Sequence, residues 1–555
     1  MKYGLLGLSF TLVLAGQTPP SHVHYEKTAD YAKPAANGAM APRLQNVGTH
    51  KFAVTTKSAR AQLFINQGVN LIYGFNHLEA GRAFAEAARL DPNCAMAYWG
   101  QALALGPNIN APMNAADEPK ALALAQKAVA LKAKATPRER AYIDALSKRY
   151  TGKHEDRAKG DQAFADAMRE VKRKLPNDLD AATMSAESLM DLRPWDYWTR
   201  DGHPQPGIEE AAAAIESVMK RNPKHPGALH YWVHLMEPTK SPERAEKAAD
   251  VLMPLAPAAG HLVHMPGHIY QRIGRYADAA KANELAVAAD EDYITQCRAQ
   301  GMYPLTYYPH NVHFLWVAAT MQGRSRVALE AARKVAATIP AEALRTMPPL
   351  QGFVVVPYWA MVRFGKWDDI VKEPRPPHDT LYTAGVWHYA RGIALTATGK
   401  LDEAQKELEE LRKITADPKL KEIPLPQNPP SAILAVAEHA LAGELAAKRG
   451  QYDAAILDLD RAVRLHDGLR YTEPDDWHYP MRDSLGAVLL QAGRAAEAEE
   501  VYWDNLRRFR ENGWSLFGLM QALKAQGKTK EAAEIEARFR KAWSAADVTL
   551  TASRF

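Results

Sequence analysis

Residues 493–532 read GRAAEAEEVYWDNLRRFRENGWSLFGLMQALKAQGKTKEA, and one short pattern both opens and closes this stretch. The pattern is a glycine followed five positions later by an alanine, and its two glycines, Gly493 and Gly527, stand 34 residues apart. Such a glycine ends a helix in a left-handed conformation, and the small alanine lets the next helix cross closely. Because 34 residues is the tetratricopeptide period, the stretch predicts a repeated hairpin of two helices.

The same pattern recurs along the chain at other positions. It is found at Gly274–Ala279, Gly323–Ala328, Gly399–Ala404 and Gly450–Ala455, and Phe75–Ala80 has the same shape with phenylalanine in the glycine's place. Several spacings exceed 34 residues, so some units carry insertions or extra turns. From about residue 58 the composition is helical. We therefore predict an all-α protein, a TPR-like helical-repeat solenoid in which helix hairpins form a right-handed superhelix with a concave groove.

Composition and cysteine usage narrow the function classes. The chain has 555 residues, is 24% charged and carries a net charge of +5, with no dense basic stripe, so we expect no nucleic-acid partner. Cys94 and Cys297 are the only cysteines. They cannot form a four-cysteine metal site, and their wide separation favours two buried free thiols over a disulfide, which the sequence leaves open.

The N-terminus has the pattern of an export signal. Lys2 precedes an apolar run, residues 4–15, that is too short to span a bilayer, and Val13 and Ala15 suit the cleavage positions. We expect a signal peptide at 1–16 and a periplasmic or secreted protein without a transmembrane anchor. The expected organisation continues with an extended arm at 17–57, N-terminal helices at 58–200, central histidine-rich helices at 201–345 and C-terminal helices at 346–555.

Nineteen histidines are present, and many lie in the central part of the chain. Three pairs have helical spacing, which puts both imidazoles of a pair on one helix face. The pairs are His230 with His234, followed by Glu237; His264 with His268, preceded by His261; and His310 with His313.

The histidine pairs are in register with the repeat. A shift of 34 residues takes His230 to His264 and His234 to His268, and a shift of 49 takes His264 to His313. Neighbouring helices pack about 8–10 Å apart, so imidazoles of successive hairpins can meet at one or two ions. We expect a site for copper, iron or zinc; spacing does not choose among them. The expected ligands are His230, His234, His264, His268 and His313, with His310, His261 and Glu237 as alternates.

The helix geometry at Pro266 and an alternative role for the histidines both bear on this expectation. Pro266 lies inside the second pair and can open the helix there, because it has no N–H to donate. Ordinary core or groove histidines, bonded to carbonyls and carboxylates, are the alternative interpretation. Aromatic and polar residues that could complete a substrate pocket, or only pack neighbouring repeats, are Trp232, Tyr307, Tyr308, Glu473, Trp477, His478 and Arg482.

The chain resembles a group of exported bacterial tetratricopeptide-repeat proteins. The matching stretches are residues 73–110, 260–279 (GHLVHMPGHIYQRIGRYADA), 307–316 (YYPHNVHFLW) and 473–506. The resemblance implies a tetratricopeptide solenoid outside the cytoplasm, and it implies no established reaction.

Two functions remain open at this point. One is a metal-binding protein and candidate metalloenzyme, oxidative with copper or iron and hydrolytic with zinc, acting on a small molecule or peptide in the groove. The other is a non-catalytic scaffold that binds a peptide or partner protein. Whether the protein is an enzyme, and its oligomeric state, stay undetermined by the sequence.

Overall fold

The computed structural model describes residues 34–35, 37–297, 303–377, 380–423, 425 and 427–555. The expected signal peptide lies outside these residues. Within them the regular elements are helices, and the only β-bridges are two isolated ones, Asn108–Ala111 and Trp198–Pro204. The prediction of an all-α fold is confirmed.

The N-terminal part of the solenoid contains four helix pairs. They are α2 (Ala59–Tyr73), α3 (His77–Leu90), α4 (Ala95–Leu105), α5 (Glu118–Leu131), α6 (Pro137–Leu146), α7 (Arg157–Lys174), α8 (Leu179–Asp191) and α9 (Ile208–Arg221). The central part follows with α10 (Pro226–Met236), α11 (Glu246–Leu252), α12 (Gly260–His264), α13 (Pro266–Ile273), α14 (Tyr276–Cys297), the π-helix η5 (Tyr303–Tyr307), α15 (Tyr308–Met321) and α16 (Ser325–Ala337).

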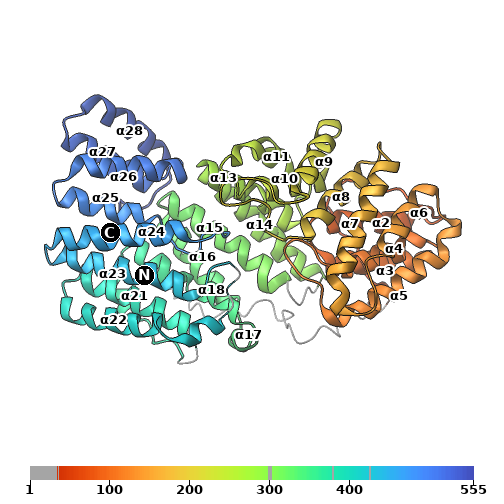
Figure 1. The fold of residues 1–555 in the computed structure, drawn as a ribbon, viewed down its shortest axis with the longest axis horizontal. Helices are drawn as coiled ribbons and strands as arrows, with labels where there is room; N and C mark the ends of the chain where they lie inside the picture. The colour runs from red at the N-terminus through yellow and green to blue at the C-terminus, as the bar shows by residue number, and fades with distance from the viewer. Residues whose placement is uncertain (1–33, 36, 298–302, 378–379, 424, 426) are drawn as a thin grey trace, which may run out of the picture.

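The C-terminal part begins with short helices and ends with regular hairpins. Its elements are α17 (Ala341–Thr346), α18 (Gln351–Val354), α19 (Val356–Arg363), α20 (Trp367–Lys372), α21 (Leu381–Ala397), α22 (Leu401–Thr415), α23 (Pro430–Lys448), α24 (Tyr452–Gly468), α25 (Met481–Gln491), α26 (Ala495–Arg508), α27 (Gly513–Ala525) and α28 (Thr529–Ala542). In Figure 1 the N-terminal and C-terminal hairpins form the two ends of an elongated molecule, with α10 to α15 between them.

The turn glycines adopt the backbone conformation that the repeat pattern predicts. All six have positive φ: Gly274, Gly323, Gly399, Gly450, Gly493 and Gly527, with φ between 68° and 83°. Phe75 occupies the equivalent position in the first hairpin and also has positive φ, 56°. This conformation strains the backbone of a residue with a bulky side chain. The strain at Phe75 indicates that its aromatic ring is needed at this position, which glycine could not provide.

Segments at both ends of the described chain join the repeats together. Residues 37–57 run without helix over the first hairpins, where Phe52 stacks on Trp99 with ring centroids 5.7 Å apart. At the other end, Asp547 accepts hydrogen bonds from the backbone N–H groups of Ser325 and Arg326 at the start of α16. The first contact holds the N-terminal arm against α4, and the second joins the C-terminal segment to α16.

Two further sequence expectations concern the cysteines and the membrane. Cys94 and Cys297 are both buried free thiols, as the sequence favours. None of the described helices is long and apolar enough to cross a bilayer.

Candidate metal centre

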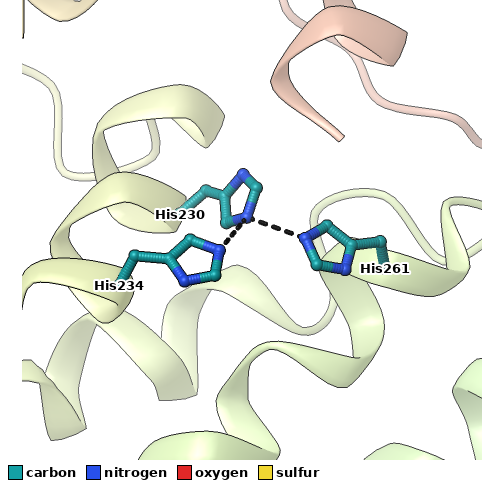
Figure 2. Close-up of side chains that lie close together, drawn as sticks. All are labelled: His230, His234 and His261. Carbon is teal, nitrogen blue, oxygen red and sulfur yellow. Dashed lines mark hydrogen bonds between the residues drawn. The ribbon is translucent and has the colours of Figure 1, made fainter. Parts of the chain in front are cut away.

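Three buried histidines converge at the middle of the molecule. His230 and His234 extend from α10 and His261 from α12, and Figure 2 shows the three rings pointing toward one another. The Nε2 atom of His230 lies 3.0 Å from that of His234 and 3.1 Å from that of His261. All three residues are at most 1% exposed. We call these residues triad A.

The hydrogen bonds on the far side of the rings determine where the protons lie. His230 Nδ1 donates to the carbonyl of Tyr73 at 2.6 Å, and His234 Nδ1 donates to Glu237 Oε1 at 2.8 Å. The Tyr73 carbonyl carries no proton, so His230 Nδ1 must hold the hydrogen. Burial and Glu473 raise the pKa of Glu237, but the contact with His268 favours its carboxylate form, in which His234 Nδ1 is also the donor. Burial lowers the pKa of His230 to about 3, which keeps the ring neutral. The two Nε2 atoms therefore bear lone pairs.

Facing lone pairs at 3.0 Å repel each other unless a cation lies between them. Zn–N bonds are about 2.0–2.1 Å, so ligands on a tetrahedron around such an ion stand about 3.3 Å apart. The two Nε2 separations from His230 are close to that value. The donor set therefore fits a transition-metal ion bound by three neutral imidazoles.

A second triad lies directly beside the first. His264 of α12, His268 of α13 and His310 of α15 bring ligand atoms within 4.8 Å of one another, and we call them triad B. His264 Nδ1 donates to Asn283 Oδ1 at 2.7 Å, while the amide nitrogen of Asn283 donates to the Ala279 carbonyl at 2.8 Å. The Nε2 atom of His264 is therefore unprotonated and available to a metal.

His268 differs from the other histidines because two carboxylates contact its Nδ1. Glu473 Oε2 lies 3.0 Å from this nitrogen, and Glu237 Oε2 also contacts it. Burial lowers the pKa of His268, but Glu237 and Glu473 outweigh burial and raise it to about 10. In the metal-free state the imidazolium donates from Nε2 to His264 Nε2 at 2.6 Å. A metal ion would take the place of that proton, since ligand histidines must be neutral.

Glu237 connects the two triads through one carboxylate. Its Oε1 accepts from His234 of triad A, and its Oε2 contacts His268 of triad B. The residue is completely buried. Glu237 thus lies behind the rings and orients two ligands, the usual place of a carboxylate around a histidine metal site.

Each triad is covered by a phenylalanine. Phe75 has ring-centroid distances of 4.5, 5.9 and 5.3 Å to His230, His234 and His261. Phe314 of α15 has distances of 4.8, 4.3 and 5.0 Å to the rings of triad B. These apolar rings exclude water from the nitrogen clusters, which strengthens the electrostatic interactions there.

Strained backbone gathers around triad A. Among the described residues four other than glycine have positive φ, and two of these, Phe75 and Trp195, contact the triad. The Trp195 ring lies 5.3 Å from the ring of His234. Strain of this kind persists where the surrounding structure needs a side chain in one place.

Pro266 tightens its helix without breaking it. α12 ends at His264 and α13 begins at Pro266, but Met265 between them keeps helical angles, φ −49° and ψ −40°. His268 donates its backbone N–H to the Met265 carbonyl at 3.1 Å, one residue closer than in a regular α-helix. The two imidazoles consequently stay on one face.

Some of the expected site residues lie elsewhere. His313 is in neither triad; its ring stacks on Trp316 at 5.2 Å, and His310, an alternate in the sequence-based set, completes triad B. Trp232 Nε1 donates to the Arg244 carbonyl, and the Tyr308 hydroxyl donates to Glu291. Arg482 pairs with Asp467 and Asp504.

Other expected residues do surround the triads. The Tyr307 ring lies 5.0 Å from His261. A cavity of about 500 Å³ extends from His268 and Phe314 to the loop between α24 and α25, where Glu473, Trp477 and His478 line it. The sequence-based set omitted Phe75, Phe314, Tyr73 and Asn283. Only Phe75 carried a signal in the sequence, namely its place at a turn that elsewhere uses glycine.

A third group of histidine and carboxylate side chains, His50, Asp180 and His225, lies outside the two triads. His50 Nε2 lies 2.8 Å and His225 Nε2 3.3 Å from Asp180 Oδ1, which also accepts from the Tyr73 hydroxyl. His225 Nδ1 accepts the N–H of Ala228, so the proton of His225 is on Nε2 and faces the carboxylate. His225 Nε2 is in ionic contact with Asp180 but has no hydrogen-bond partner, so hydrogen bonds account for part of this cluster.

Comparisons with known proteins leave the family open. No protein-family model and no curated protein matches the chain. Among solved structures it is similar to the human IFIT1 dimer with m7Gppp-AAAA (14% identity, 88% of this chain, 95% of that chain, TM-score 0.32) and to the Cut9–Hcn1 hetero-tetramer of the APC/C (12%, 87%, 76%, 0.32). Yeast Tom70 is also similar (12% identity, 87% of this chain, 91% of that chain, TM-score 0.26). TM-scores this low carry no functional conclusion.

Proposed function

We propose that this protein binds two transition-metal ions, one in triad A and one in triad B, with Glu237 joining the two sites. The observation that carries the proposal is the proton arrangement in triad A. Nδ1 of His230 and Nδ1 of His234 each donate to another acceptor. Their Nε2 lone pairs therefore face each other where the side chains are buried from water. A cation removes the repulsion.

The donor set defines the class of metal and of chemistry. Neutral imidazole nitrogens without thiolate suit copper, zinc or iron. Three protein ligands leave a coordination position for water or substrate, which is the arrangement of catalytic sites. A bound copper or iron would supply oxidation and a bound zinc would supply an activated water. The apolar N-terminal run supports export, so we place this activity outside the cytoplasm.

The test is metal content. Full-length protein purified without a His-tag is stripped with chelator, reloaded with zinc, copper or iron, and analysed by mass spectrometry. We expect two ions per chain. His234→Ala and His264→Ala each lose one ion, and the double variant loses both.

His313→Ala is the matched control, because His313 lies one helical turn from His310 but outside both triads. It should keep both ions. Substoichiometric loading of the unaltered protein with all three metals would overturn the proposal.

The helical-repeat fold also suits a scaffold that binds a peptide or partner protein. In that case the histidines would line the groove and be exposed. Five of the six triad histidines are instead at most 1% exposed, which favours the metal site.

A further inference from the structure

A cavity adjoins triad B and is also lined by the loop between α24 and α25, whose Glu473 contacts His268. It is about 500 Å³ in volume, within the range of small-molecule sites. One wall is formed by α13, α14 and α15, including His268, Tyr276 and Phe314, and the opposite wall by the loop, including Tyr471 and Trp477. No residue of triad A lines it.

Polar atoms without hydrogen-bond partners gather in the walls of this cavity. Tyr276 is 4% exposed and Trp477 is 2% exposed, yet neither the Tyr276 hydroxyl nor Trp477 Nε1 has a partner among the described residues. The same holds for Glu473 Oε1 and Gln271 Oε1. Leaving such groups buried and unpaired costs about 1–3 kcal/mol each. Several of them around one cavity indicate that a ligand supplies the missing hydrogen bonds.

The unpaired polar atoms determine which hydrogen-bond donors and acceptors a ligand must carry. Glu473 Oε1 and Gln271 Oε1 accept only, so they require hydrogen-bond donors on the ligand. Trp477 Nε1 donates only and therefore requires an acceptor. A hydroxyl group satisfies both demands. The cavity thus matches a molecule with one or more hydroxyls.

The remaining lining combines aromatic side chains with charged ones, among them Arg272, Arg470, Asp475, Asp476, Arg507, Arg508 and Arg510. Phe314, Tyr471 and Trp477 face the cavity, and the Arg272 guanidinium lies 5.0 Å from the centre of the Tyr471 ring. Aromatic side chains favour planar rings in offset or edge-to-face contact. Phe314, Tyr471 and Trp477 offer ring faces on which a flat hydroxylated ring can stack, whereas an aliphatic polyol cannot.

Glu473 links the cavity to triad B. Its Oε2 lies 3.0 Å from His268 Nδ1 in an ionic contact, while its Oε1 has no hydrogen-bond partner among the described residues. A ligand hydroxyl on Oε1 would therefore be joined to a triad B histidine through a single carboxylate. Nothing comparable connects the cavity to triad A.

We propose that the cavity binds a small hydroxylated aromatic molecule of the phenol or catechol class, whose hydroxyl donates to Glu473 and accepts from Trp477. The inference deepens the proposed function, because it places the substrate class next to the triad B ion. Binding itself uses side chains that are present without metal, so the two proposals can fail separately.

Calorimetric titration of the metal-free, full-length protein tests the proposal. The probes are 4-methylcatechol and cis-1,2-cyclohexanediol, which share adjacent hydroxyls and differ in aromaticity. We expect saturable 1:1 binding of 4-methylcatechol and at least about tenfold weaker binding of the aliphatic diol. Failure of 4-methylcatechol to bind, or equal binding of the diol, overturns the inference.

Conservative variants locate the binding. Trp477→Phe and Tyr276→Phe each remove one polar group while keeping an aromatic ring, and Glu473→Gln keeps the shape but removes the charge. Each should weaken 4-methylcatechol binding about 3–10-fold, the effect of one lost hydrogen bond. Trp503→Phe is the control, because Trp503 is 37% exposed and does not line the cavity. Unchanged affinity in all three cavity variants overturns the assignment.

Metal content separates the outcomes of the two proposals. Probe binding by a protein that loads no metal would leave the ligand site standing and the metal centre refuted. Two bound ions together with no probe binding would refute only the ligand site.

Discussion

At single residues, the two ring nitrogens of each histidine have different tasks. Nδ1 of His230, His234 and His264 donates to a carbonyl, a carboxylate and an amide oxygen respectively. Their Nε2 atoms consequently turn lone pairs toward the neighbouring rings. The third cluster, around Asp180, reverses this at His225, whose Nδ1 accepts the Ala228 N–H. His388, outside the triads, also has a carboxylate at Nδ1, so the triads are distinguished by this Nδ1 arrangement together with the convergence of their ligand atoms.

Glu237→Gln should weaken metal binding at both triads. The Glu237 carboxylate accepts from His234 and is in ionic contact with His268, whereas glutamine has one acceptor oxygen and places an N–H₂ group against the other ring. We expect affinity to fall about 10–100-fold for at least one ion, measured by competition with a chelator. Glu407→Gln removes a similar contact to His388 Nδ1, at 2.6 Å, outside the triads. It should leave affinity unchanged; an equal loss in both variants would argue against the bridge.

Phe75→Gly tests the strained ring over triad A. Glycine accepts the positive φ without strain, so part of the cost of losing a buried ring is offset. The ligands remain, but water gains access to the ion. We expect one of the two ions to leave to a chelator faster, while Phe314→Ala accelerates the other. Release rates equal to those of the unaltered protein would show that the rings do not shield the ions.

At the level of helix hairpins, the turn glycines differ in what surrounds them. Gly399 has φ +81° and nothing within 4 Å of an added Cβ. Gly274 has φ +83°, and an added Cβ would stand 2.5 Å from the Arg510 carbonyl oxygen, which belongs to the turn between α26 and α27. Gly274 therefore serves both as a turn and as a contact between distant repeats.

Alanine at these two glycines should destabilise the protein unequally. Gly399→Ala carries only the left-handed backbone cost, about 1–2 kcal/mol. Gly274→Ala adds a clash with backbone and should cost clearly more. Urea denaturation followed by circular dichroism measures the difference. Similar midpoints for the two variants would mean that the Arg510 contact gives way freely.

At the scale of the whole molecule, two bound ions would tie successive hairpins together. Triad A joins α10 to α12, and triad B joins α12 and α13 to α15. Glu473 adds the loop before α25 through its contact with His268. In a repeat protein, where each unit otherwise contacts mainly its neighbours, such links increase cooperativity.

Removing the metal should therefore lower the thermal midpoint of unfolding. An ion at one hundred times its dissociation constant contributes about 2.7 kcal/mol to the folded state. We expect chelator to lower the midpoint of the unaltered protein and of His313→Ala, and to leave that of the double variant His234→Ala/His264→Ala unaffected. A chelator effect of equal size in the double variant would place the stabilising ion elsewhere.

The hairpins, their turns and the histidine register could be predicted from the sequence, because helix periodicity and turn glycines are local properties. The positive φ of Gly493 and Gly527 follows from the pattern within one repeat. So does the placement of His230 and His234 on one face of α10, since four residues make about one turn. The position of the histidine cluster in the chain was foreseeable for the same reason.

Which histidines meet depends on how the hairpins pack. A 49-residue shift pairs His264 with His313 in register, but α15 follows a π-helix and presents His310 to triad B. The bridging position of Glu237, the covering rings of Phe75 and Phe314, and the contact of Glu473 with His268 each join residues far apart in sequence. Local spacing fixes the face on which a side chain lies, whereas helix rotation and the path of the loops set its partner, and these arise from the packing of the whole chain.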